Sequence, residues 1–194
     1  MRPIEQIEML YQAKHRVFGE NRPQELKAKY EVLPNDIEWH FIGHLQSNKI
    51  KYIAPFVSLI HSADSFSLLQ EINNHAKKNN RIIPCLLQFF IAQETTKYGF
   101  LLEECKKMLK SPFFTLLKNV KIVGIMGMAT FTDDKKMIRD EFKTLYHYFT
   151  QLKTQYFANN PDFKEISMGM SDDHEIAIEE GSTIVRIGSA IFKE

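Results

Sequence analysis

Two clusters of small residues near the end of the chain surround a single arginine, and this combination is suited to binding an anion. Ser167–Ser171 (SMGMS) follows one apolar run, Gly188-Ser189 follows another, and Arg186 lies inside the second run. Small residues at a strand end let main-chain N–H groups approach an anion closely, and the start of a following helix adds partial positive charge. The pattern indicates a phosphate site. Plain tight turns are the alternative, and Asp172 and Asp173 would oppose an anion unless they point away.

Arg186 needs a partner if its strand is buried. A guanidinium removed from water is costly unless an acceptor or a negative charge compensates it. A carboxylate such as Glu165 is one candidate, and a heteroatom of a bound ligand is the other. The spacing leaves both open.

Two histidines, His40 and His44, invite comparison with a metal site. Four residues of a strand span ~13 Å, which is too far for two ligands of one ion. We expect His40 to be a structural residue of the core or rim and His44 alone to reach the functional face. No metal site is predicted, and no arrangement of nucleophile and base indicates a hydrolase.

Seven short apolar runs alternate with amphipathic segments along the chain. The predicted strands cover residues 15–20, 38–43, 57–61, 82–91, 121–129, 164–168 and 183–191, and helical patterns include 65–78, 100–109, 134–157 and 171–179. Ser65 and Ser171 are plausible helix caps. Alternating strands and helices are typical of a parallel α/β fold. Because the runs are almost continuously apolar, both faces of the sheet are covered, and a (β/α)8 TIM-type barrel is predicted.

The chain opens in a helix rather than a strand. Pro3 occupies a first-turn position, and Ile4, Ile7 and Leu10 follow at helical spacing. We therefore expect a barrel that lacks its first strand. In such a barrel the carboxyl ends of the strands form the functional face, and phosphate is often held after the last two strands.

Composition is that of an ordinary globular protein. The 194 residues suffice for a single domain, and the formal net charge of +1 argues against a nucleic-acid binder. The cysteines, Cys85 and Cys105, do not form a metal or redox motif. No segment has the length of a membrane span and no apolar signal region is present. A cytoplasmic protein is predicted.

Several segments resemble the pyridoxal 5'-phosphate homeostasis protein family. They are FGENRPQE (18–25), EWHFIGHLQSNKIK (38–51), HSADS (61–65), GIMGMAT (124–130) and the long block ISMGMSDDHEIAIEEGSTIVRIGSAIF (166–192). Members of this family are single-domain relatives of the alanine racemase N-terminal barrel. The resemblance runs from about residue 3 to the end.

The resemblance implies a protein that binds pyridoxal 5'-phosphate (PLP) and buffers or delivers it within vitamin B6 homeostasis, without clear catalysis. It implies that Ser167, Gly169, Ser171, Gly188 and Ser189 cradle the phosphate. It also implies that Arg186 faces the pyridine nitrogen and that Asn21 and His44 lie near the ring. We expect a monomer whose partners are PLP, or a related B6 phosphate, and apo PLP enzymes.

Two other functions stay open. One is a PLP-dependent amino-acid racemase, although such enzymes carry a second domain for which 194 residues leave no room. The other is a remnant that binds phosphate ligands without a covalent bond.

The chain departs from the family at its start. The family's first strand ends in a Ser-Lys-Thr-like segment, just before the proline that Pro3 matches, and that lysine forms the Schiff base with PLP. This sequence reads Met1-Arg2-Pro3, and Lys14 does not match the position. We expect Met1 to be an internal methionine of a protein roughly 25–30 residues longer, since one helix and one strand take about that length. A truncated or diverged form is the alternative.

Overall fold

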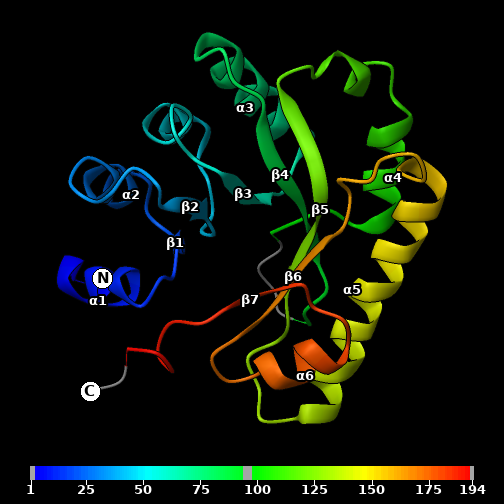
Figure 1. Cartoon of the computed structure of the whole chain (residues 1–194). Coiled ribbons are helices and arrows are strands. Elements are labelled where there is room, and N and C mark those ends of the chain that lie inside the picture. The colour runs from blue at the N-terminus through cyan, green and yellow to red at the C-terminus, as the bar shows by residue number, and fades with distance from the viewer. Residues whose placement is uncertain (1–2, 94–97, 193–194) are drawn as a thin grey trace.

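Seven parallel strands form one sheet that curls into an incomplete barrel (Figure 1). The computed structural model describes residues 3–93 and 98–192. Met1 and Arg2, at the start of the chain, lie outside these ranges. The strands are β1 (Val17–Glu20), β2 (Glu38–Phe41), β3 (Leu59–Ala63), β4 (Ile83–Phe90), β5 (Val120–Met128), β6 (Glu165–Met170) and β7 (Ile184–Arg186).

Helices cover the outside of this sheet. They are α1 (Ile4–Gln12), α2 (Pro23–Tyr30), α3 (Phe66–Lys78), α4 (Leu102–Lys110), α5 (Lys135–Tyr156) and α6 (His174–Glu179), with 3-10 turns η1 (Ser47–Tyr52) and η2 (Phe114–Leu116). Strand order follows chain order, and every neighbouring pair is parallel. The barrel-type α/β fold predicted from the sequence is confirmed. Within the described residues, no helix combines the length and the apolar character that a membrane span requires.

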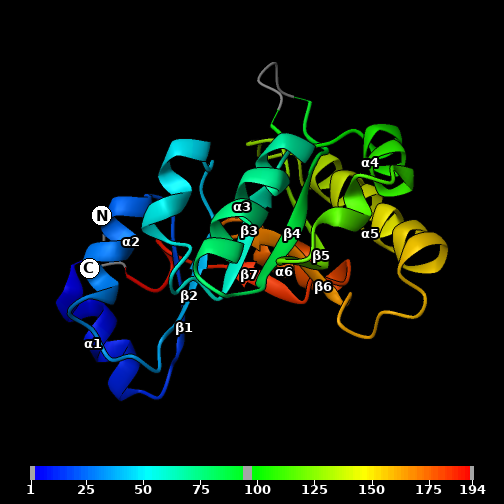
Figure 2. The same cartoon turned by 90° about the horizontal axis from the view of Figure 1, so that it is seen from above.

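The barrel has a seam between its first and last strands. Within the described ranges, β1 pairs only with β2, and β7 pairs only with β6. After β7 the chain runs back toward α1 in both views (Figures 1 and 2). The carboxyl-terminal segment therefore passes the seam on the side where the chain begins.

The inside of the barrel is built in layers. Leu59, Leu86 and Met126 form a small buried apolar cluster, against which Val123 and Ile184 pack. Side chains two residues further along a strand lie on the same face of the sheet, one layer nearer the carboxyl ends. On β3 and β7 those next residues are His61 and Arg186. The polar layer thus rests on an apolar floor.

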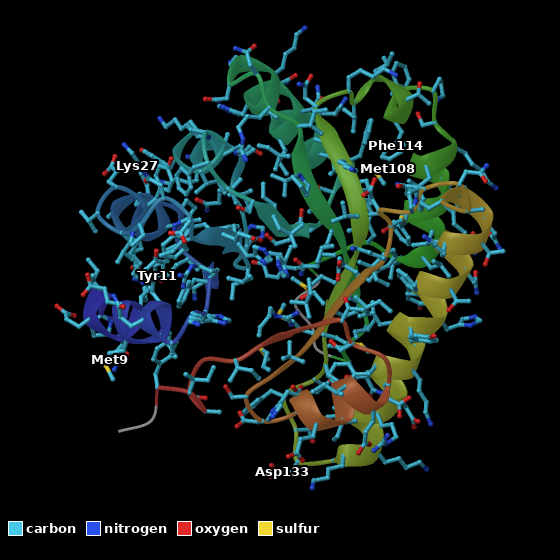
Figure 3. The ribbon with its side chains drawn as sticks, viewed as in Figure 1. Met9, Tyr11, Lys27, Met108, Phe114 and Asp133 are labelled. Carbon is cyan, nitrogen blue, oxygen red and sulfur yellow. The ribbon has the colours of Figure 1, made fainter. Side chains whose placement is uncertain are left out.

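The first helix is fastened to the amino end of the strands by a polar cluster. The Tyr11 hydroxyl donates to Asp36 Oδ1 at 2.7 Å, and Arg16 Nε donates to Asp36 Oδ2 at 2.9 Å. The Arg16 guanidinium also lies 3.8 Å from the centre of the Tyr11 ring. Figure 3 shows Tyr11 beside α1, on the side that faces α2. This cluster orients α1 against the sheet.

The boundaries near the functional face differ from the sequence predictions. The strand predicted for 183–191 spans only Ile184–Arg186. Ser65 caps α3, because its Oγ accepts from Leu68 N at 3.3 Å, as predicted. Ser171 does not cap α6, which begins at His174. The Ser171 hydroxyl instead faces the 188–190 turn, which sequence spacing could not reveal.

Gly169 allows α6 to pack directly on β6. Its φ is +92°, a conformation that costs other residues strain, and a Cβ there would lie 2.5 Å from Ala177 Cβ. We expect Gly169→Ala to lower the free energy of unfolding by at least about 2 kcal/mol, measured by urea denaturation. Gly188→Ala is the matched control, since no atom lies within 4 Å of a Cβ there. Its expected effect is below about 0.5 kcal/mol. Equal losses in both variants would contradict this account.

Candidate functional site

A cavity of about 1800 Å³ runs along the inside of the barrel, and its lining includes residues at the carboxyl ends of the strands, such as Gly188, and at the amino ends, such as His15 and Lys164. Asp133, labelled in Figure 3, lies at the carboxyl ends of the strands and lines the cavity. Six of the eight residues proposed from the sequence line it as well: Asn21, His44, Ser171, Arg186, Gly188 and Ser189. The fold therefore brings together groups from both ends of the chain.

Arg186 is half-buried and brings a positive charge to the polar layer inside the barrel. Its Nη1 donates to Ser167 Oγ at 2.6 Å, and its Nη2 donates to the carbonyl of Gly127 at 3.2 Å. A guanidinium has five N–H donors, so these two contacts leave donors for the cavity. Burial lowers the pKa of Arg186 to about 10, while the charge of Asp173 acts to raise it, and the group stays cationic at neutral pH.

Glu165 is not the partner of Arg186. Its carboxylate accepts from the Thr183 hydroxyl at 2.7 Å and lies 4.0 Å from the ammonium of Lys164. Glu165 precedes Ser167 by two residues on β6, so it belongs to a layer nearer the amino ends of the strands. Glu165, the carboxylate that the sequence offered as a partner, is therefore not in contact with Arg186.

Ser167 lies inside the barrel rather than at the tip of its strand. The side chain is fully buried. Its Oγ contacts Arg186 Nη1 and lies 2.9 Å from His61 Nδ1. The Nε2 of His61 lies in turn 3.0 Å from His40 Nδ1. A continuous chain of hydrogen bonds thus crosses the barrel from β7 through β6 and β3 to β2.

The two strands that carry His61 and Ser167, β3 and β6, are irregular beside these residues. The register of β3 shifts between Ile60 and Ala63, on either side of His61. The register of β6 shifts between Ser167 and Met170. Such irregularities re-aim side chains and are frequent next to functional sites. They allow His61 and Ser167 to meet across the barrel.

The two histidines of this hydrogen-bond chain, His40 and His61, are neutral near pH 7. Burial lowers the pKa of His40 to about 4. The pKa of His61 is lowered well below its usual value, first by burial and then by the neighbouring charges of His40 and Arg186. Neither ring therefore carries a positive charge at neutral pH.

The turn after β7 and the turn after β6 meet at one oxygen. Ser171 Oγ accepts from Gly188 N at 3.2 Å and from Ala190 N at 3.4 Å. Two main-chain N–H groups converging on one oxygen is an arrangement that an anion oxygen also fits. The space in front of Gly188 is open for 4 Å around the Cβ position, which leaves room for a ligand.

Gly169 faces away from this open space. Its Cβ position is directed at Ala177 and His174 of α6, and Gly169 does not line the cavity. The carboxylate of Asp173 accepts from Met170 N at 2.5 Å, which fixes the start of the same turn. Gly169 therefore shapes the turn after β6, and Ser167 holds Arg186.

Asn21 and His44 follow β1 and β2, across the seam from the end of β7. A Cβ on Gly43 would lie 2.3 Å from the main-chain oxygen of Asn21, so this glycine lets the two loops touch. His44 Nδ1 lies 3.2 Å from Asp64 Oδ2, and its ring is 4.5 Å from that of Tyr98. His40 and His44 therefore have different partners, His61 and Asp64.

The sequence reasoning missed the joint role of His40, His61 and Ser167. The sequence alone predicts a structural role for His40 and a phosphate contact for Ser167. Alternation along β2 and β3 places His40 and His61 on the inner face, which is a readable signal. The meeting of β3 with β6 across the barrel is tertiary and carries no local signal.

Comparison with known proteins gives the family. A profile described as "Alanine racemase, N-terminal domain" matches residues 3–194. A pyridoxal phosphate homeostasis protein of Aquifex aeolicus (strain VF5) is 42% identical over 194 residues, covering 99% of this chain and 82% of that protein. The protein of the same name from Helicobacter pylori (strain ATCC 700392 / 26695) is 38% identical over 192 residues, covering 98% and 82%. The chain belongs to the pyridoxal phosphate homeostasis protein family.

Solved structures agree with membership of the pyridoxal phosphate homeostasis family. PipY of Synechococcus elongatus PCC7942 without PLP has a TM-score of 0.90 and 32% identity, covering 98% of this chain and 88% of PipY. PipY with PLP bound has a TM-score of 0.86 and 31% identity over the same shares. Alanine racemase of Bartonella henselae has a TM-score of 0.68 at 18% identity, covering 95% of this chain and 50% of the racemase. That last likeness concerns the fold alone.

The neutral histidine pair makes stability depend on pH. Below pH 6.5 the unfolded chain binds protons that folded His40 and His61 do not, so stability falls as the pH drops toward 4. For His40 alone the loss is about 3 kcal/mol at pH 4. Urea denaturation of the wild type and His40→Gln across this range measures it. The variant should show the shallower decline, and exposed His147→Gln should follow the wild type. Parallel curves for wild type and His40→Gln would contradict the account.

Proposed function

We propose that this protein binds pyridoxal 5'-phosphate at the mouth of the barrel and serves in PLP homeostasis without a catalytic turnover of its own. The observation that carries the proposal is a half-buried arginine, Arg186, which keeps N–H donors for a ligand and lies two residues before a turn with converging amides and open space at Gly188. The names of the relatives and the PLP-bound PipY structure support it.

The phosphate fits the turn that follows β7. Main-chain N–H groups of Gly188 and Ala190 already converge on Ser171 Oγ. A phosphate oxygen would take that position, with the Ser171 hydroxyl turning to donate to it. Ser189 is next to these amides and lines the same cavity. Main-chain donors suit phosphate because they are fixed in place before the ligand arrives.

The aromatic ring fits the space beside Arg186. PLP, when bound, supplies an aldehyde and a pyridine ring that can act as an electron sink. Arg186 is cationic at neutral pH, so it can donate a hydrogen bond to the pyridine nitrogen. It cannot accept a hydrogen bond from a protonated pyridine nitrogen, and the ring therefore stays unprotonated. An unprotonated ring is a weak electron sink. The residue therefore favours holding the cofactor over carbanion chemistry.

The remaining sequence-proposed residues divide into two groups. Ser167 and Gly169 act indirectly, Ser167 by holding Arg186 and Gly169 by shaping the turn. Asn21 and His44 line the cavity after β1 and β2 and lie near the ring in this proposal.

Within the described residues, two lysines line the cavity. Lys135 is at the start of α5, and Lys164 is just before β6.

The proposal extends to the way the protein is used. A mouth that opens to solvent lets the cofactor enter and leave, which suits exchange with apo PLP enzymes. The proposed state is a monomer with one site in each chain, and size-exclusion chromatography with light scattering tests it. A dimer that persists on dilution would contradict this part of the proposal.

Calorimetric titration with PLP and with pyridoxal, which lacks the phosphate, tests the function. We expect PLP to bind and pyridoxal to bind about 10–100-fold more weakly, because charge-assisted hydrogen bonds contribute about 1.5–3 kcal/mol. Arg186→Met and Ser171→Ala should each weaken PLP binding about tenfold or more. Arg16→Met and Ser67→Ala, which lie outside the cavity, are the matched controls.

Two results would overturn the proposal. One is equal affinity for PLP and pyridoxal, which would show that the phosphate group does not contribute to binding. The other is a protein that takes up no PLP at all. Circular dichroism of each variant shows whether a loss of binding comes with a loss of fold.

A further inference from the structure

The hydrogen-bond chain Arg186–Ser167–His61–His40 has a direction set by its first member. An arginine can only donate, so Ser167 Oγ accepts from it. The Ser167 hydroxyl proton then needs an acceptor of its own, because the side chain is fully buried. Among the described residues, the acceptor within reach is His61 Nδ1, at 2.9 Å.

The direction passes on through the two rings. His61 accepts at Nδ1, and a neutral imidazole carries its one proton on the other nitrogen. His61 therefore donates from Nε2 to His40 Nδ1, across 3.0 Å. By the same rule, His40 carries its proton on Nε2. The ring of His40 lines the cavity, and the described residues supply no partner for this nitrogen.

We infer that His40 is a specificity-determining residue, fixed by Arg186 through Ser167 and His61 as a neutral N–H donor that faces the ligand. A ligand in the cavity must then place a hydrogen-bond acceptor, such as a ring or phenolic oxygen or an unprotonated nitrogen, against His40. A ligand group that can only donate is rejected there, since it would leave two opposed donors. The inference rests on the proposed function for its ligand, and the proton positions can be measured without one.

The reverse direction is disfavoured for a physical reason. If His40 donated to His61, His61 would donate to Ser167 from Nδ1. Ser167 Oγ would then accept twice, from His61 and from Arg186, and its own buried proton would lack an acceptor. A buried unsatisfied donor costs about 1–3 kcal/mol. That cost fixes one arrangement of protons.

Nuclear magnetic resonance of the ligand-free wild type tests the direction. With histidine ring nitrogens labelled with nitrogen-15, coupling across the His61–His40 hydrogen bond identifies the nitrogen that carries the shared proton. We expect the proton on His61 Nε2, with His40 Nδ1 as the acceptor. A shared proton on His40 Nδ1 would overturn the inference, whether or not the protein binds PLP.

PLP titration of two His40 variants tests the specificity. Glutamine can accept from His61 and still donate to a ligand, so His40→Gln should bind PLP within about threefold of the wild type. His40→Met can do neither, and its affinity should fall about tenfold. Exposed His147→Met is the control. Unchanged PLP affinity in a folded His40→Met protein would refute the role, whereas a wild type that binds no PLP would refute the proposed function instead. The resonance measurement stands if His40→Met does not fold.

Discussion

The partial burial of one guanidinium organises this protein. Arg186 is half-buried, which lowers its pKa to about 10, and it has no carboxylate in hydrogen-bond contact within the described residues. A partly buried cation of this kind needs oriented acceptors or a ligand. Ser167 and the Gly127 carbonyl supply two acceptors, which leaves further N–H donors on a residue that lines the cavity. The site is therefore prepared for a molecule that brings acceptors with it.

The fold supplies what the arginine requires. A parallel barrel stacks its inward side chains in layers, so an apolar layer can exclude water beneath a polar one. Leu59, Leu86 and Met126 form that lower layer, and His61 lies one step above it on β3. The neutral histidines add no further charge to the interior at pH 7. The loops beyond them, around Gly188, form the face that is open to a phosphate.

Much of the fold and part of the site could be predicted from the sequence. The alternation of apolar runs and helical segments predicts the parallel barrel, and the Arg186 to Gly188 spacing predicts a cation beside a small turn. Local patterns do not encode which strands face each other across the barrel. For that reason the sequence alone places Ser167 at the phosphate and offers Glu165 as a partner of Arg186, whereas the structure pairs Ser167 with Arg186. Ser171 was predicted as a cap, although its hydroxyl reaches the neighbouring turn.

A crystal structure of the protein with PLP is the most direct test of the central claim, that Arg186 and the 188–190 turn together form the cofactor site. The account predicts the phosphate on the amides of Gly188 and Ala190, in the position that Ser171 Oγ occupies. It also predicts the pyridine ring within hydrogen-bond distance of Arg186. A phosphate bound elsewhere, or an Arg186 guanidinium that makes no contact with the ring, would contradict it.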